Sequence, residues 1–402
     1  MKRAGGYFLM LAAVSIMMAL SGFSVIAAKP LYSECINHGD VNLDGEITAA
    51  DAQGAFLIVL GIFIPTWQEE CAADCNGDGN VTAADAQRIF LTALGAESCE
   101  DPLTVFEAGD LYSTDAIVGN MRFVPAGTFT QGSPETEPCR NDKEGPQFEH
   151  TLTRNIAVME TEISRWIWFG LRIVQSDLPT DPSDILASPW PESPVQRVTW
   201  YEAVLFANLL SLQNGYAPCY YKDEEFTIPV DVTNYNDLEN VFYCNFNARG
   251  YRLPTEGERE YFTRAGTTTP FSLDEQNYNE STCGTESCQT GTLPTLDDHC
   301  VFCSYIPFPE IGPMEVGSKL PNPWNLHDVH GNVEEWCWDR YSETYPIGAV
   351  TDYTGVVAGS FRVKRGGKWH GTARWCRSAF RSADYGGTRY NWIGFRLVRT
   401  VP

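Results

Sequence analysis

The 402-residue chain is poor in basic residues, with 28 lysines and arginines against 52 aspartates and glutamates, and its formal net charge is -24. Nucleic acids and anionic membranes bind basic patches, so this balance excludes both as partners. The six histidines, and the lack of a Gly-x-Ser-x-Gly motif or a phosphate-binding loop, leave hydrolase and kinase chemistry without support. After residue 28, the chain has no apolar run long enough to span a bilayer.

The first 28 residues do contain such a run. Lys2 and Arg3 precede an apolar stretch from Tyr7 to Ala28 that ends in small residues, which is the pattern of a secretory signal peptide. We therefore expect a signal peptide over residues 1–28 and a secreted or cell-surface protein, in a bacterial type of envelope or outside the cell. The alternative is an uncleaved segment that anchors the chain in a membrane.

Export makes the 13 cysteines disulfide candidates, and their odd number leaves at least one thiol free or paired between chains. Spacing alone leaves the pairings open. The candidate pairs are Cys376 with Cys337, Cys219 with Cys244, and any of three connectivities among Cys35, Cys71, Cys75 and Cys99.

An acidic pattern over residues 40–51 recurs over residues 74–85. Each copy has oxygen-bearing side chains at the ligand positions of an EF-type calcium loop, and glycine at the sixth position for the tight turn. The predicted ligands are Asp40, Asn42, Asp44, the carbonyl of Glu46, Thr48 and Asp51 in loop one, and Asp74, Asn76, Asp78, the carbonyl of Asn80, Thr82 and Asp85 in loop two. The alternative is a pair of Asx-rich turns without a metal.

A short helix is expected after each loop, from Ala52 to Leu60 and from Ala86 to Leu94. Apolar residues at helical spacing, Phe56 and Leu60 among them, predict that the two helices bury one stripe against each other. Aspartate at the last ligand position, and no helix before either loop, resemble the type I dockerin. This resemblance, over residues 36–96, implies calcium-dependent folding and a cohesin-like partner.

A linker is expected over residues 97–117, followed by one large domain over residues 118–402. Residues 121–132 predict a strand and a turn, and residues 200–212 predict a helix. Thr255 and Glu258 have the spacing of a helix capping box. Short strands, turns and few helices predict an α+β fold with much irregular structure, besides the small α-helical module with its two calcium loops.

Six short motifs along this domain begin at Phe123, Pro194, Gly250, Gly331, Arg365 and Gly394. In this order they resemble the formylglycine-generating enzyme, or sulfatase-modifying factor, family. The resemblance spans about residues 120–399 and implies a C-type-lectin-like fold stabilised by calcium. It implies a calcium site at Asn332, Val333 and Glu335, which offer two side-chain oxygens and a carbonyl. The alternative is a plain turn with a solvated Glu335.

The oxidase of this family uses copper(I) held by two cysteines, at the fourth and ninth positions after an Arg-Gly-Gly. Here those positions are Gly371 and Cys376, and Lys368 stands where the family carries a serine. One thiolate makes neither a two-coordinate copper site nor an internal disulfide. The sequence therefore argues against copper and favours a domain without catalysis. The alternative is an oxidoreductase of the formylglycine-generating type that acts on a sulfatase cysteine through Cys376 and another thiol.

Residues 368–391 are rich in Trp, Tyr and Arg, which dominate binding hot spots. The predicted ligand-binding residues are Trp369, His370, Arg374, Trp375, Arg377, Tyr385, Arg389 and Tyr390. The stretch also resembles the variable region of retroelement-diversified proteins, and its other interpretation is a core-facing aromatic set with solvated arginines. The predicted function is a secreted calcium-binding protein that binds a protein or glycan at this face. Its dockerin tethers it, as in polysaccharide-degrading complexes.

Overall fold

The computed structural model describes residues 39–44, 46–63, 65, 69, 72–73, 75, 81, 83–94, 106–236, 242–282, 293–302 and 312–401. The predicted signal peptide and every ligand of the second calcium loop except Asp85 lie outside these ranges. Within them, no helix combines the length and apolar character needed to cross a membrane.

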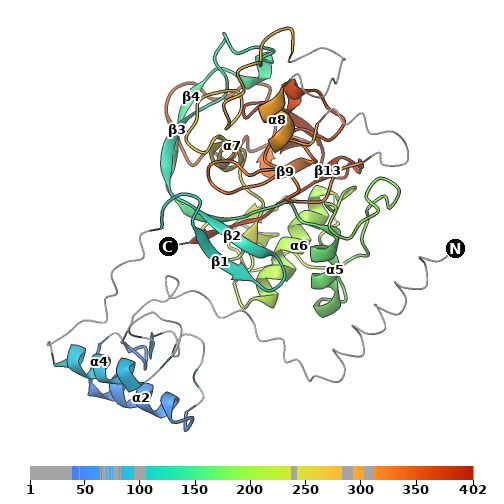
Figure 1. The fold of residues 1–402 in the computed structure, drawn as a ribbon. Coiled ribbons are helices and arrows are strands. Elements are labelled where there is room, and N and C mark those ends of the chain that lie inside the picture. The colour runs from blue at the N-terminus through green and yellow to red at the C-terminus, as the bar shows by residue number, and fades with distance from the viewer. Residues whose placement is uncertain are drawn as a thin grey trace.

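The N-terminal module contains two helices, α2 (Ala49–Val59) and α4 (Ala83–Ala93), which pack together (Figure 1). Their buried contact residues are mostly alanines, with Ala52 and Ala55 on α2 and Ala86 beside Ile89 on α4.

The predicted stripe is wrong at its large residues, because Phe56 is 48% exposed and Leu60 is 54% exposed. Phe90 and Leu94, their counterparts in the second repeat, are 46% and 65% exposed. The alanine faces allow the helices to approach closely, which leaves the bulky side chains on the outside.

The first and last strands of the large domain meet in one five-stranded sheet (Figure 1). Its order is β1 (Leu111–Asp115), β2 (Gly119–Val124), β5 (Asn155–Met159), β14 (Val398–Val401) and β8 (Tyr251–Arg252), and every neighbouring pair is antiparallel. The C-terminal strand β14 thus lies between strands from much earlier in the chain, which closes the domain.

Three smaller sheets complete the domain. One has the order β12 (Arg381–Tyr385), β11 (Phe361–Arg365), β9 (Glu334–Arg340) and β13 (Ile393–Gly394); another has β10 (Val350–Thr351), β4 (Phe148–Leu152) and β3 (Gly127–Gln131); the last has β6 (Tyr220–Tyr221) and β7 (Tyr243–Cys244). The strand predicted over residues 121–132 is therefore two strands, β2 and β3, in different sheets. Pro125 lies between them and has no N–H to continue a ladder.

The helices of this domain are α5 (Arg165–Val174), α6 (Trp200–Gln213), α7 (Glu256–Arg264) and α8 (Pro294–His299), with 3-10 turns η2 (Asp142–Glu144) and η3 (Ala373–Cys376). The helix predicted over residues 200–212 is α6. The predicted capping box is also confirmed: Glu258 N donates to Thr255 Oγ1 at 3.1 Å, and Thr255 N donates to Glu258 Oε2 at 2.8 Å.

The main core lies between α5, α6 and the five-stranded sheet. Trp168 of α5 stacks on Phe206 of α6 with ring centroids 5.2 Å apart, and Trp336 of β9 is fully buried in the same cluster. Buried Arg–Glu pairs also link the short elements, as Arg252 of β8 does with Glu258 of α7 at 2.7 Å. The result is the expected α+β fold with modest regular structure.

Candidate functional site

The family motifs that begin at Gly331 and at Arg365 lie side by side. Gly331 N donates to Gly366 O at 2.6 Å, and Trp369 N donates to Asn332 O at 2.7 Å. Strands β9 and β11, which carry the two motifs, are antiparallel neighbours in one sheet. The predicted calcium turn and the segment that carries Cys376 therefore share a single scaffold.

Cys376 lies at the end of η3 with its side chain fully buried. At Gly371, a Cβ atom would lie 2.7 Å from the indole ring of Trp375 and 3.1 Å from the carbonyl oxygen of Lys368. Real Cβ atoms almost never approach so closely. The space that a second cysteine side chain would need is thus occupied by Trp375.

The thiol of Cys300, at the C-terminal end of α8, lies in the same small buried cluster as Cys376. Both are thiols in the structure. Cys337, which the sequence offered as a partner for Cys376, is buried on β9 near Asp339 and Arg259. Sequence reasoning missed Cys300 because only the tertiary fold brings these two segments together.

Cys219 and Cys244, the other pair that the sequence offered, lie at the ribbon of β6 and β7. Both are thiols. Asn245 N, beside Cys244, donates to Cys219 O at 2.8 Å, and the two thiol groups interact electrostatically.

His330, in the motif that begins the site, is a structural group. Ser272 N donates to its Nε2 at 3.1 Å, so Nδ1 carries the proton and donates to Cys376 O at 2.8 Å. Burial lowers the pKa of His330 to about 3, so the imidazole stays neutral. Both ring nitrogens make hydrogen bonds within the protein, so neither is left to bind a metal or to give a proton to an acceptor.

The predicted calcium ligands Asn332 and Val333 are held by a buried carboxylate. Asn332 Nδ2 donates to Glu162 Oε2 at 2.7 Å, and Val333 N donates to Glu162 Oε1 at 3.0 Å. Burial and then the neighbouring Asp328 raise the pKa of Glu162 well above its usual value. Oδ1 of Asp328 is buried without a hydrogen-bond partner. Two buried carboxylates, an amide oxygen and backbone carbonyls are the oxygen ligands that calcium prefers.

Glu335, the third predicted ligand, lies between two arginines. Its Oε2 is 2.8 Å from Arg259 Nε, and its Oε1 is 2.9 Å from Arg396 Nε. These cations hold the pKa of Glu335 below its usual value although burial opposes them. Across the described ranges, no three or more His, Cys, Asp or Glu side chains form a group that could hold a metal. The calcium site here stays a prediction, and Glu162 and Asp328 fit it better than Glu335.

In the first loop of the N-terminal module, backbone N–H groups donate to carboxylates of the predicted ligands, and calcium binding by these residues stays a prediction. Asp44 N donates to Asp40 Oδ1 and Glu46 N donates to Asp44 Oδ1, both at 3.0 Å. The carboxylate of Asp51 accepts from Thr48 N at 2.8 Å, which also caps α2. This arrangement draws the carboxylates of the first, fifth and twelfth loop positions toward the turn. Asp85, the described ligand of loop two, is buried.

An aromatic surface lies next to Gly371, and we call it the C-terminal face: Lys368, His370, Trp375, Tyr390 and Trp392. The ammonium nitrogen of Lys368 is 4.5 Å from the ring centroid of Trp375 and 4.7 Å from that of Trp392. Tyr390 stacks on Trp392 with centroids 4.4 Å apart. Burial, and then the charge of Lys368, lower the pKa of His370 to about 4, so its ring is neutral near pH 7.

The other predicted ligand-binding residues differ in exposure. Trp369 and Arg377 are buried, and Arg377 pairs with Glu144 at 2.5 Å inside the domain. Tyr385 is 58% exposed, Arg374 is half-buried, and Arg389 is exposed. The sequence reasoning missed Trp392, which is half-buried against the main core and lies in the turn closed by Ile393 N donating to Tyr390 O at 3.1 Å.

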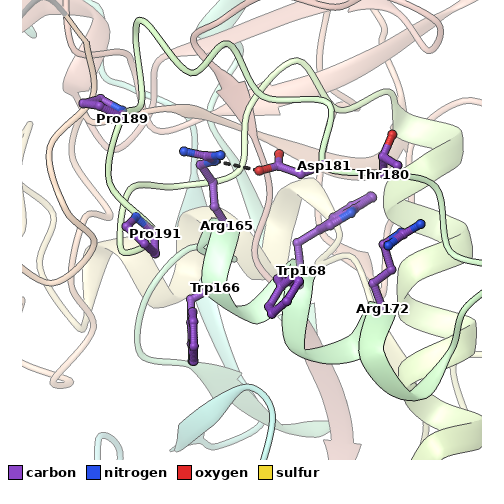
Figure 2. A pocket seen from close by; sticks show the side chains of 9 residues that line it. Arg165, Trp166, Trp168, Arg172, Thr180, Asp181, Pro189 and Pro191 are labelled. Carbon is purple, nitrogen blue, oxygen red and sulfur yellow. Dashed lines mark hydrogen bonds and ion pairs between the residues drawn. The ribbon is translucent and has the colours of Figure 1, made fainter. Parts of the chain in front are cut away.

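A cavity of about 390 Å³ lies between α5 and the segment 180–191 (Figure 2). Trp166, Phe169 and two prolines supply apolar walls, and Arg165 Nε binds Asp181 Oδ2 at 2.6 Å. Trp166 is 56% exposed. The volume of this cavity is within the range of small-ligand pockets. No motif in the sequence points to this cavity, since tryptophan in a helix is more often a core residue.

Comparison with known proteins defines the class of both parts. Residues 110–401 match the sulfatase-modifying factor enzyme 1-like domain, and residues 38–90 match the type I dockerin domain. The chain therefore belongs to the family of the sulfatase-modifying factor, or formylglycine-generating, proteins and carries a type I dockerin, a domain type that binds calcium.

Individual relatives differ in how much they share. The formylglycine-generating enzyme of Thermomonospora curvata is 27% identical over 311 residues, which are 69% of this chain and 94% of that enzyme. The chaperone protein LppX of Paenibacillus barcinonensis is 29% identical over 190 residues, 44% of this chain, and the match spans only 59% of the chaperone. The solved structure of Treponema denticola variable protein 1 is 28% identical and covers 70% of this chain and 94% of its own, with a TM-score of 0.55.

Proposed function

We propose that this protein is a secreted, calcium-binding, two-module protein whose large domain binds a protein or glycan without catalysing formylglycine formation. The dockerin tethers it to a cohesin-bearing partner in an extracellular assembly. The single observation that carries the proposal is the geometry at Gly371, where Trp375 fills the space of the missing cysteine.

The surroundings of Cys376 support the same conclusion. Its side chain is fully buried, so a substrate cysteine cannot reach the sulfur without rearrangement. The surface above it presents Lys368 between two indole rings instead of a pair of thiolates. A copper(I) site of the family type needs two soft ligands open to substrate.

The C-terminal face supports binding. Its stacked rings Tyr390 and Trp392 offer a large, rigid apolar area, and Lys368 supplies a donor beside it. Aromatic rings with a polar group at their edge are typical of hot spots that bind with little loss of entropy. Tyr390 is 42% exposed, so a ligand can reach the stack.

The test is a binding screen of the full-length protein against immobilised plant and bacterial polysaccharides and against a library of displayed peptides. Trp392→Ala is expected to weaken binding of any ligand found by tenfold or more, about 1.4 kcal/mol. The matched control is Trp190→Ala, because Trp190 is 53% exposed but lies outside this face. Equal binding by wild type and Trp392→Ala would remove the face from the proposal.

The dockerin supplies the second binding surface of the protein, the one that contacts the cohesin partner. Phe56 and Leu60 of one repeat, and Phe90 and Leu94 of the other, form exposed apolar pairs at equivalent positions. Ala49 and Ala50 occupy exposed positions where dockerins commonly carry specificity residues. We infer that a cohesin partner of this chain contacts these apolar pairs more than polar groups near the loop.

A second candidate is an oxidoreductase of the formylglycine-generating type. The observation in its favour is the similarity that spans 94% of the Thermomonospora curvata enzyme, together with a thiol, Cys300, beside Cys376. Formylglycine formation on a sulfatase-motif peptide by copper-loaded protein would establish it and refute the first proposal. Activity retained in Cys376→Ala would refute the role of that thiol.

The similarity to a Treponema denticola variable protein favours a third interpretation, in which the C-terminal face is diversified by a retroelement. A near-copy of the encoding DNA beside a reverse transcriptase gene, with differences mainly at adenines, would support it. A genome without such a copy would refute it.

A further inference from the structure

Two hydrogen bonds and one close packing contact fix the surroundings of Cys300 and Cys376. Asn332 N donates to Val301 O at 2.8 Å, which fixes the segment that follows Cys300. His330 Nδ1 donates to Cys376 O at 2.8 Å, which fixes the other cysteine from the same turn. A Cβ atom at Gly331 would lie 2.6 Å from Cys300 Sγ, so the turn is packed directly against that thiol.

The two side chains share a small apolar cluster. Cys300 is 2% exposed and Cys376 is fully buried, and Phe271, Leu296 and Ala373 pack around them. A Cβ atom at Gly367 would lie 2.8 Å from Cys376 Sγ, and the neighbouring Gly366 accepts from Gly331 N, so the two thiols pack against adjoining segments. No other cysteine belongs to this cluster in the described part of the chain.

This environment suits a neutral link better than a reactive thiolate. Burial raises the pKa of Cys300 well above its usual value, and the hydrogen bond to Cys376 adds to the rise. Thiolates are the nucleophiles and the copper ligands, so a thiol held in its protonated form is poor at both tasks. A disulfide carries no charge and needs no hydrogen bond, so the apolar cluster holds it without penalty.

We propose that Cys300 and Cys376 are joined by a disulfide in the mature protein. One S–S bond forms in this chain while one breaks in an external thiol–disulfide oxidoreductase, which takes up the two electrons and two protons that the thiols give up. A disulfide joins sulfurs about 2.05 Å apart, and the two thiols lie in one buried cluster from which such a bond can form. Cys75 and Cys139 each take part in a disulfide in the same structure, which fits a chain that matures in an oxidising compartment.

The link has a structural consequence. It ties the end of α8 to η3, whose Trp375 belongs to the C-terminal face. It also uses up the one thiol at a family oxidase position. The inference stands on the packing of the two buried thiols in one cluster and does not depend on whether the face binds a ligand.

Peptide mapping of the native, full-length protein tests the link without any substitution. The protein is secreted into an oxidising medium, its free thiols are alkylated with iodoacetamide in denaturant, and it is digested without reductant. A linked peptide pair that contains Cys300 and Cys376, with Cys337 alkylated, is the expected result. Alkylation of both cysteines in most molecules overturns the proposal. So does a link from Cys300 to Cys303, which lies three residues further on.

Thermal unfolding gives an independent test. A reductant is expected to lower the melting midpoint of the large domain by roughly 4–8 °C, the scale of a native disulfide in a domain of this size. Reductant should lower the melting midpoint by less than in wild type, and by the same amount, in Cys300→Ser, Cys376→Ser and the double variant. Cys337→Ser is the matched control, since its thiol is also fully buried, and it should respond to reductant as wild type does. An unchanged response in Cys300→Ser overturns the proposal.

Discussion

Gly371 shows how a single residue can change the chemistry available to a domain. The family oxidase needs a cysteine there, and this chain has a glycine next to a tryptophan that occupies the same space. Trp375 is in turn covered by the Lys368 ammonium at 4.5 Å. The loss of the cysteine is therefore accompanied by a repacked surface. A cysteine placed at residue 371 is not expected to restore the copper site by itself.

Gly371→Cys is expected to lower the free energy of unfolding by about 1–3 kcal/mol, because its Cβ overlaps the Trp375 ring. It should produce no formylglycine from a sulfatase-motif peptide with copper. Gly387→Cys is the control in the same segment, since a Cβ there meets nothing within 4 Å; its effect should stay within about 0.5 kcal/mol. Urea unfolding measures both. Equal stability of the two variants would contradict the steric argument.

His150 makes stability depend on pH. Tyr353 N donates to its Nε2 at 3.0 Å, so the Nδ1 hydrogen points to Gln131 Oε1 at 2.7 Å and the ring is held neutral. Burial lowers the pKa of His150 below the value of about 6.5 expected in the unfolded chain. The unfolded state therefore binds the proton more readily, and this contribution, complete above pH 6.5, is lost as pH falls toward the folded pKa.

Below pH 6.5 the loss from His150 approaches about 1.4 kcal/mol per pH unit. Urea midpoints at pH 7.5 and pH 5.0 measure it in wild type and in His150→Asn. The variant is expected to be less stable at pH 7.5 but to lose less on acidification. Parallel pH profiles for the two proteins would show that His150 is not the titrating group.

At the scale of elements, α6 and α7 begin with the same capping box but carry different ion pairs. Glu202 caps α6 and meets Arg389, whose side chain is 41% exposed, at 2.7 Å. Glu258 caps α7 and meets the fully buried Arg252, also at 2.7 Å. Glutamine preserves the cap in both helices, so the two substitutions isolate the ion pairs.

Glu258→Gln is expected to cost about 3–5 kcal/mol, because it leaves the charge of Arg252 buried without a partner. Glu202→Gln should cost about 1 kcal/mol or less, because solvent screens Arg389. Chemical denaturation of both variants at one pH gives the comparison. Similar costs would mean that the buried pair contributes no more than the exposed one.

These elements also show what the sequence can predict. The capping box at Thr255, the helix from Trp200 and the helix that follows the first loop depend on neighbours within a few residues, so local patterns suffice. The contact of Cys300 with Cys376 and the pairing of Glu335 with two arginines depend on the tertiary fold, which one sequence does not encode in any spacing. The prediction that Phe56 is buried was wrong for a related reason, because helical periodicity does not reveal which face meets the partner helix.

At the scale of the whole molecule, calcium is expected to act on both modules through different ligands. Calcium binding by the dockerin loops is expected to need Asp40 and its equivalent Asp74. In the large domain it is expected to need Glu162 and Asp328, beside Asn332, and we call this place the corner of the large domain. A ligand that binds only the folded state at a hundred times its Kd stabilises that state by about 2.7 kcal/mol. Chelation should therefore lower the stability of each module separately.

The double variant Asp40→Ala/Asp74→Ala separates the two sites. It is expected to lose calcium-dependent pull-down by a type I cohesin, while its large domain melts at the wild-type temperature because its own carboxylates are intact. Adding a chelator to this variant should then lower the melting midpoint of the large domain, since only the corner beside Glu162 still holds calcium. Differential scanning calorimetry measures the midpoint. No shift with chelator would exclude the corner site, and cohesin binding retained by the double variant would exclude the loops as its calcium switch.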